Sequence, residues 1–470
     1  MRLYSDHVLV DTEDGPQITA ARIDTAGARI ASVQLGSRED LVTRGVVDFG
    51  SRLIAPAWVN GHTHIAMSAY RGIGGRAAQA GNVVEELYFR LESFAEPDDI
   101  LAFARMGAWE VALSGTGAIV DQYYAGEMIA QALLDIGLSG IVAPTLQDIN
   151  GPGMKDWSAA LDTTEQLATD PRYAAAGIFP ALGPHATDTV SVNLWGRALT
   201  LAERHNLPVH VHVGQSLEEV ERSFERYQCT PVQRLARMGA LDSKASLYLV
   251  HMLYVSEADL RSLDASRHTL GYCPRSQVQF AYPAHLGSWR EAGLPFLVGT
   301  DAGVCNDTMN VQQELRWLAG AGIYSVPFSS EHRTFRERGD LFSARHVERV
   351  RRDQFAADAP LNEPLNLMAA AGRTARRLHP QLDVGRIGAG ALANLCVYDL
   401  DHPALWPATD PLRALTHGDP GPALHAMVLG GNWFGTPGYL VPSLTSSDRF
   451  QAHRDEATRR LQLLLQRAGL

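Results

Sequence analysis

Histidine and aspartate side chains recur at the ends of apolar runs in this sequence, and these residue types suit metal-ion chemistry. The first pair, His62 and His64, follows the short apolar run Leu53–Ala55 and flanks Thr63. Alternate residues of a strand point to the same side, so an extended backbone places both imidazoles on one side. Two neutral imidazoles on one side of a strand provide half of a zinc-type site.

The other half of such a site can come from later runs. His185 follows one apolar run, His210 and His212 alternate along a second, His251 ends a third, and Asp301 follows a fourth. In a parallel barrel all strands end at the same face, so we expect these side chains to meet there.

The elements that would position these residues alternate regularly. The predicted strands are 116–124, 140–146, 176–182, 208–213, 246–251, 269–273 and 295–299. The helical stretches between them include 129–136, 191–204, 217–227 and 311–319. Together with the strand that leads to His62, this is the pattern of a (β/α)8 TIM barrel, an α/β fold.

The two ends of the chain differ from this middle part. Residues 1–55 and 384–445 contain short apolar runs separated by turns, which indicates antiparallel strands. We therefore predict a small β-sandwich built from both chain ends beside a barrel of residues 56–383. Residues 446–470 contain arginine and glutamate interleaved with leucine, which predicts an amphipathic C-terminal helix on the surface or at a subunit contact.

Three imidazoles and one carboxylate suit a zinc or iron(II) ion that keeps one position open for water. Our predicted ligands are His62, His64, His212 and Asp301. His210 would face the same side as His212 but further from the strand end, so we place it one layer below or in a supporting role.

The chemistry expected from such a site is hydrolysis. The metal lowers the pKa of its water and supplies hydroxide near neutral pH. Asp301 can contact the metal and accept the proton of the water, and His251 can hydrogen-bond the water and the developing alkoxide.

Composition excludes several other classes. The chain has 470 residues and a formal net charge of -11, which argues against nucleic acid as a partner. The sequence has neither a secretory leader nor an apolar run long enough to span a bilayer, so we expect a cytoplasmic protein without membrane contact. The four cysteines are scattered and are interpreted as buried thiols in a reducing compartment.

These motifs together resemble the amidohydrolase superfamily, and within it the aminohydrolase branch. The similarity is greatest to the S-adenosylhomocysteine/5'-methylthioadenosine deaminases and the triazine hydrolases, and it covers nearly the whole chain. The matching segments are Asn60–His64 with Met67 and Arg71-Gly72, Val120–Tyr124, Gly183–His185, His210–His212, His251 and Gly299–Gly303.

This resemblance implies a single divalent metal, Zn2+ before Fe2+, at the four predicted ligands. It also implies that His251 orients the hydroxide and that His185 contacts a small heterocyclic substrate. Two-metal relatives bridge their ions with a carboxylated lysine from strand four, but residues 176–185 contain no lysine. We further expect a homodimer or homotetramer.

One residue departs from the deaminase pattern. The deaminases carry a glutamate three residues after the third histidine ligand, where this chain has Gln215. A carboxamide cannot titrate near neutral pH, and loss of general acid/base help typically costs about 10²–10⁴ in rate.

Three interpretations of Gln215 stay open. The chain is a deaminase inactivated at this position, a hydrolase of an amide, alkylamine or halide that uses Asp301 as its sole acid/base, or a metal-holding binding protein without turnover. The function that the residues favour is hydrolytic deamination of an N-heterocycle, with Gln215 hydrogen-bonding the substrate.

Other departures concern the pocket around these residues. Ala186–Asp188 replaces the usual Pro-Tyr element, and Arg275 stands near the barrel mouth, where it would neutralise an anionic substrate or form a surface salt bridge. The loop 72–82 offers no nucleoside-binding carboxylate, although Glu85 or Glu86 could fill that role. Glu218 and Glu219 are expected to point to solvent.

Overall fold

The computed structural model describes residues 1–73, 82–280, 286–320, 326 and 329–469. Most of the loop 72–82, for which we expected no substrate-binding carboxylate, lies outside these residues. Within the described chain, no helix is both long and apolar enough to cross a membrane.

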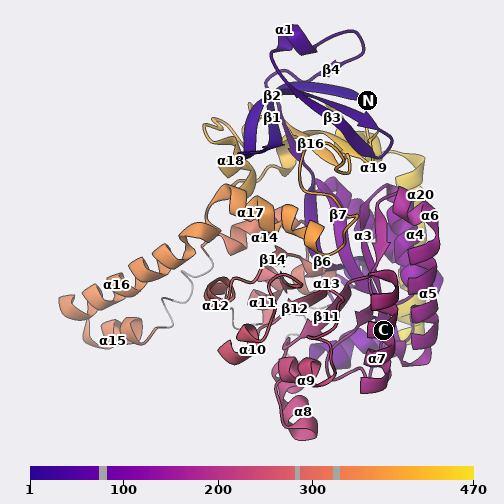
Figure 1. Ribbon diagram of the computed structural model, residues 1–470, viewed down its shortest axis with the longest axis vertical. Helices are drawn as coiled ribbons and strands as arrows, with labels where there is room; N and C mark the ends of the chain where they lie inside the picture. The colour runs from indigo at the N-terminus through magenta and orange to yellow at the C-terminus, as the bar shows by residue number, and fades with distance from the viewer. Residues whose placement is uncertain (74–81, 281–285, 321–325, 327–328, 470) are drawn as a thin grey trace.

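Strands from both ends of the chain pair in one eight-stranded sheet (Figure 1). Its strands are β1 (Arg2–Thr12), β2 (Gly15–Ala26), β3 (Arg29–Leu35), β4 (Val47–Asp48), β5 (Leu53–Pro56), β16 (Leu395–Tyr398), β17 (Leu424–Leu429) and β18 (Asn432–Trp433). The order is β18-β17-β16-β5-β1-β2-β3, with β4 on β1. The pairing of β5 with β16 joins the two ends of the chain. These pairings give one continuous sheet, and the expected two-sheet sandwich is not confirmed.

The middle of the chain forms a parallel barrel. Its strands are β6 (Trp58–His64), β7 (Thr116–Tyr123), β8 (Ser139–Leu146), β9 (Ile178–Pro180), β10 (Gly183–Pro184), β11 (Val209–Val213), β12 (Leu247–His251), β13 (His268–Tyr272), β14 (Phe296–Val298) and β15 (Asp301–Ala302). Parallel pairing runs from β6 through β7 and β8 to β9 and β10, and separately from β11 to β14. Bridges at Leu182–Val209 and Ala186–His212 join the two sets, and β15 pairs with β6, so the ring closes.

Helices surround this ring and reach beyond it. On the barrel they are α2 (Phe89–Glu92), α3 (Pro97–Leu113), α4 (Gly126–Ile136), α5 (Trp157–Thr169), α6 (Pro171–Ala175), α7 (Val192–His205), α8 (Leu217–Tyr227), α9 (Pro231–Arg237), α10 (Glu257–Arg261), α11 (Pro274–Phe280), α12 (Leu286–Glu291), α13 (Gly303–Asn306), α14 (Val311–Leu318) and α17 (Pro364–Ala370). The remainder are α1 (Arg38–Leu41), α15 (Ser330–Arg338), α16 (Leu341–Asp358), α18 (Pro411–His417), α19 (Leu440–Thr445) and α20 (Asp448–Ala468). The strand and helix stretches expected from the sequence coincide with these elements to within a few residues.

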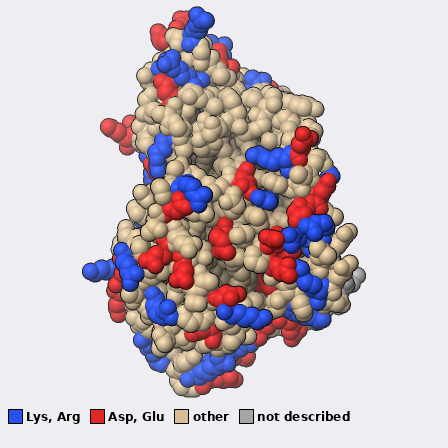
Figure 2. Space-filling view, turned by 90° about the vertical axis from the view of Figure 1, so that its right-hand side faces the viewer, with Lys and Arg blue, Asp and Glu red and all other residues tan. Residues whose placement is uncertain are grey.

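The C-terminal helix α20 packs along α3 rather than standing apart. Arg460 pairs with Asp98 at 2.7 Å, and the indole nitrogen of Trp109 donates to Nδ1 of His453 at 3.1 Å. Arg467 also pairs with the buried carboxylate of Asp99. Figure 2 shows acidic and basic side chains intermingled on this side of the molecule rather than gathered by sign.

A close approach of two backbones sets the position of the first histidine. A Cβ atom added at Gly299 would lie 2.3 Å from the backbone nitrogen of His62 and 2.6 Å from its carbonyl oxygen. Only glycine therefore allows the end of β14 to pass this close to β6. The same approach brings Asp301 opposite Thr63 in the register of β15 and β6.

We predict that Gly299→Ala lowers the free energy of unfolding by about 3 kcal/mol, because the added methyl group meets backbone atoms that cannot rotate away. Urea denaturation measures the difference. Gly196→Ala in α7 is the matched control, since an added Cβ there meets nothing within 4 Å and alanine favours a helix. Equal effects of the two substitutions would contradict this view of the β6–β14 contact.

Candidate metal centre and substrate pocket

Four of the predicted site residues converge at the C-terminal ends of three barrel strands. His62 and His64 come from β6, His212 from β11 and Asp301 from β15. The Nε2 atoms of His212 and His62 lie 3.3 Å apart, and Oδ1 of Asp301 lies 3.8 Å from Nε2 of His62 and 3.5 Å from Nε2 of His64. Four donors at about 2.1 Å from one ion in a tetrahedron would be about 3.4 Å apart. The donor set therefore fits one divalent metal ion.

The far nitrogens of these rings are held by acceptors that fix their orientation. Nδ1 of His64 lies 2.5 Å from the carbonyl oxygen of Gln122, and Nδ1 of His212 lies 2.7 Å from that of His185. Because a carbonyl oxygen only accepts, each Nδ1 carries the hydrogen and each Nε2 keeps its lone pair. The lone pairs thus face the common centre.

His210 lies below this cluster rather than within it. Its Nε2 is 2.9 Å from Nδ1 of His62, on the side of that ring away from Asp301. Its backbone carbonyl accepts a hydrogen bond from Nε2 of Gln122 at 3.2 Å. The structure therefore brings His212 to the centre and places His210 as a support for His62.

Burial keeps the imidazoles of His62 and His212 neutral. It lowers the pKa of His62 and of His212 well below the ordinary value of 6.5, and neighbouring histidines lower it further. Desolvation penalises the charged form, and a neutral imidazole is the form that binds a metal. The cluster is thus ready to accept a cation at neutral pH.

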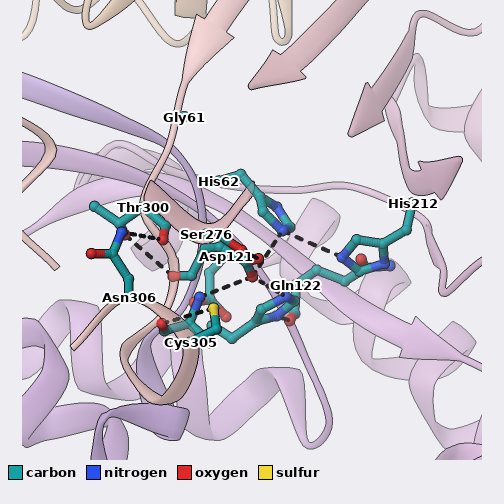
Figure 3. Close-up of polar contacts among 12 residues, drawn as sticks. Gly61, His62, Asp121, Gln122, His212, Ser276, Thr300, Cys305 and Asn306 are labelled. Carbon is teal, nitrogen blue, oxygen red and sulfur yellow. Dashed lines mark hydrogen bonds and ion pairs between the residues drawn. The ribbon is translucent and has the colours of Figure 1, made fainter. Parts of the chain in front are cut away.

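Asp301 sits in a strained but well-anchored backbone position. Its φ is 61°, in the left-handed region that aspartate adopts at a cost of about 1–3 kcal/mol. The hydroxyl of Ser276 donates to Oδ2 at 2.7 Å. Asn60 and Thr300 exchange two hydrogen bonds, at 2.7 and 3.0 Å, which link β6 to the segment before Asp301. Figure 3 shows the ring of His62 beside that of His212.

A pocket opens beside these four side chains. His185, Gln215 and His251 line it together with His64, His212 and Asp301. The ring of His251 stacks on that of His212 with centroids 5.3 Å apart. The remaining wall is formed by the following side chains: Met67, Asn82, Val83, Val84, Glu85, Tyr88, Phe89, Glu92, Gln122, Tyr123, Tyr124, Thr145, Asp188, Thr189, Ser216, Glu218, Glu219, Arg222, Ser276, Gln277, Ala302 and Cys305.

His185 is held in this pocket as a neutral base. Burial lowers its pKa to about 3, and the charges of His64 and His251 add to the effect. Its Nδ1 lies 3.1 Å from the hydroxyl of Thr189, and its ring packs against Phe89. The other ring edge is available to a ligand that offers a hydrogen bond.

The expectation that Glu219 points to solvent is wrong. Ser216 caps α8 by accepting the backbone N–H of Glu219, and the side chain of Glu219 in this first turn is buried in the pocket wall. Its carboxylate accepts the hydroxyl of Thr187 at 2.5 Å and the backbone N–H of Gln215 at 2.9 Å. Burial, with a contribution from Asp188, raises its pKa to about 7. Glu218 is half-buried and also lines the pocket.

The positions of Arg275, Glu85 and Glu86 answer two other expectations. The wall takes Ser276 and Gln277 from the segment after β13, whereas the guanidinium of Arg275 lies over the ring of Trp317 at 5.7 Å. Arg275 is therefore not placed to meet a substrate anion. Of the two glutamates considered near the loop, Glu85 lines the pocket and Glu86 is exposed.

Sequence reasoning missed the residues that hold the site together. Ser276, the Asn60–Thr300 pair and the supporting carbonyl of Gln122 act through contacts between distant segments. Asp121 is buried and accepts the backbone N–H of Ile65 at 2.7 Å. Asn60, Gln122 and Thr300 stand within segments that match the family, but the sequence analysis gave them no role.

Glu92 in the pocket wall gives a prediction about pH. Burial raises its pKa from 4.5 to about 8, so between these values the folded chain holds a proton that the unfolded chain has lost. The free energy of unfolding therefore falls as pH rises from 4.5 through 8, by at most about 5 kcal/mol for this one group. We expect Glu92→Gln to remove that part of the fall in urea denaturation between pH 5 and 9. Glu39→Gln on the exposed helix α1 is the control, and parallel curves for all three proteins would contradict the prediction.

Comparisons with known proteins agree with this architecture. Residues 53–326 match the model of the amidohydrolase family. A 5-methylthioadenosine/S-adenosylhomocysteine deaminase of Halobacterium salinarum is 27% identical over 428 residues, which cover 90% of this chain and 89% of that protein. Another, from Aquifex aeolicus, is 29% identical over 265 residues, which cover 56% of this chain and 61% of that protein.

Solved structures share the fold. An adenosine deaminase from Xanthomonas campestris with bound zinc superimposes with a TM-score of 0.80 at 20% identity, covering 98% of both chains. An atrazine chlorohydrolase from Arthrobacter aurescens complexed with zinc gives a TM-score of 0.74 at 17% identity, covering 98% of this chain and 99% of that one. With the family match over more than half of its length, this chain belongs to the amidohydrolase family.

Proposed function

We propose that this protein is a metal-dependent hydrolase that removes an amino group, as ammonia, from a ring carbon of an N-heterocycle. The observation that carries the proposal is the convergence of three imidazoles and the Asp301 carboxylate beside a pocket. The names of the relatives from Halobacterium salinarum and Aquifex aeolicus support deamination as the reaction.

We assign one divalent ion to His62, His64, His212 and Asp301, and we favour Zn2+ over Fe2+. Three imidazole nitrogens and one carboxylate oxygen suit either ion, and two of the structural relatives are described with zinc. When bound, the ion supplies a hydroxide nucleophile near neutral pH by lowering the pKa of a water molecule.

The side chains around the ion position the substrate and move the proton. Asp301 accepts the proton of the attacking water while Ser276 holds its second oxygen. His251, kept neutral by burial, hydrogen-bonds the oxygen that develops negative charge. His185 contributes a further hydrogen bond to the heterocycle from the opposite wall.

Gln215 hydrogen-bonds a ring nitrogen or carbonyl of the substrate but cannot carry a proton. The nearest titratable side chain of that turn is Glu219, which is already occupied by Thr187 and by the Gln215 backbone. Gln215 therefore also favours a second candidate, hydrolysis of an amide, alkylamine or halide with Asp301 as the sole acid/base.

The pocket charges favour a substrate without a carboxylate. Among the described lining residues Arg222 is the one arginine or lysine, and its Nη1 contacts Glu85 and lies 3.0 Å from Asp188. Both carboxylates compete with any anion for this guanidinium. Glu218 adds a negative charge to the same wall.

We predict that the protein, loaded with one equivalent of zinc, releases ammonia from members of a purine, pterin and triazine panel. Asp301→Asn should lower kcat by a factor of at least about 10², the range for lost acid/base help.

Gln215→Glu should leave kcat unchanged or lower it, because a second carboxylate would stand beside Glu219. A coupled assay for ammonia, on proteins of measured metal content, gives kcat for the parent protein and each variant. A rise of several orders of magnitude in Gln215→Glu would show a disabled deaminase, and release of halide or alkylamine alone would favour the second candidate.

We also predict a preference by charge. Adenosine analogues with a neutral 5' substituent should show kcat/KM at least 10-fold higher than adenosine analogues with a 5' carboxylate and no cationic group, at about 1.4 kcal/mol for each factor of ten. Glu218→Gln should lower the ratio of these two kcat/KM values, whereas Glu39→Gln on α1 should leave the ratio unchanged. Equal kcat/KM values for the two substrates would contradict the charge argument.

A further inference from the structure

Helices α15 and α16 form an arm that extends away from the rest of the molecule (Figure 1). The two helices pack on each other, and α16 continues into the short turn Ala359–Leu361 that leads back to the barrel. No residue of α15 is buried, and in α16 only Ser343 and Asp358, close to its two ends, are buried. The arm therefore has no hydrophobic core of its own.

Large apolar side chains lie on the outside of this arm. Leu341 and Phe342 are 67% exposed and Phe355 is 60% exposed. At 3.6 residues per turn, Leu341 and Phe355 lie on the same side of α16, about four turns apart. Helix propensity alone gives an isolated pair of helices little stability. An exposed apolar surface of this kind indicates a contact with a packing partner.

The arm is close to neutral as a whole, but one side of α16 carries unpaired positive charge on an acidic chain. Residues 330–358 carry seven arginines and six carboxylates, whereas the whole chain has a net charge of -11. Arg351 and Arg352 pair with Glu348 on their own helix. Arg345 and Arg349 lie on the side of Leu341 and have no ion-pair partner in the described part of the chain.

Helix α8 has the opposite character. Only Glu219 and Ser223 of this helix are buried, while Leu217 and Phe224 are 51% and 46% exposed. Glu221 and Glu225 are exposed on the same side, and neither has an ion-pair partner among the described residues. This face is acidic and apolar, whereas the side of α16 with Leu341, Arg345 and Arg349 is basic and apolar.

We propose that two copies of this chain associate with the arm of each copy seated on α8 of the other. A two-fold axis makes the contact twice, so that each apolar surface and each set of unpaired charges acquires a partner. Since Glu218, Glu219 and Arg222 of α8 line the pocket, the arm of one copy would also form part of the rim of the pocket in the other.

Charge reversal tests the pairing directly. Arg345→Glu/Arg349→Glu should convert the assembly to monomers at about 10 μM in light scattering, with at least a 10-fold rise in the dissociation constant. Glu221→Arg/Glu225→Arg should do the same from the other side. Mixing the two variants should restore a dimer, because both contacts of the mixed dimer again join opposite charges.

Matched controls separate this result from general damage. Arg44→Glu, an exposed arginine in the loop after α1 without an ion-pair partner among the described residues, should leave the assembly intact. Circular dichroism of each variant should remain that of the parent protein. A monomeric parent protein at this concentration, reversal variants that stay assembled, or a mixture that yields no dimer would each overturn the proposal. The measurement does not depend on catalysis, so it stands whether or not the chain deaminates heterocycles.

Discussion

The imidazole rings of His62 and His212 can share one buried space only while they are not both protonated, and the site depends on this constraint. Two protonated histidines at the 3.3 Å separation of His62 and His212 would repel each other without water to screen them. Burial prevents this by lowering the pKa of both rings. Backbone carbonyls at the far nitrogens then determine which nitrogen keeps the lone pair. A set of neutral bases with converging lone pairs is a cation site by its chemistry.

Close contacts between the first and last strands of the barrel hold the histidines and the aspartate together. Gly299 allows the end of β14 to approach the backbone of His62, and Asn60 forms two hydrogen bonds with Thr300. Asp301 then follows in a left-handed backbone conformation, with Ser276 holding one carboxylate oxygen. The positions of the histidines and of the aspartate are therefore set by one group of contacts.

Much of this arrangement could be predicted from the sequence because it follows from periodicity. Alternation along a strand places His62 with His64, and the common end of parallel strands brings His212 and Asp301 to the same face. Strand limits such as those of β7 and β11 follow from the apolar runs. The rest depends on long-range packing, which the local pattern does not contain.

The inward turn of Glu219 shows this limit clearly. Its neighbours in sequence are typical of an amphipathic surface helix. The cap at Ser216, the hydroxyl of Thr187 and the backbone N–H of Gln215 together hold its carboxylate in the pocket wall. Arg275 is the opposite case, since a residue expected near the mouth stacks on Trp317 instead. The pairing of the two chain ends in one sheet likewise depends on the long-range contact of β5 with β16.

X-ray absorption spectroscopy of the zinc-loaded protein tests the central claim most directly, together with metal analysis of the same sample. The account predicts one zinc per chain, bound by three imidazole nitrogens and a carboxylate oxygen, with a further light-atom ligand from solvent. His64→Ala should remove one imidazole from the spectrum or abolish binding, whereas Glu39→Gln should change neither. Two zinc ions per chain, sulfur ligation, or a spectrum unchanged by loss of His64 would contradict the account.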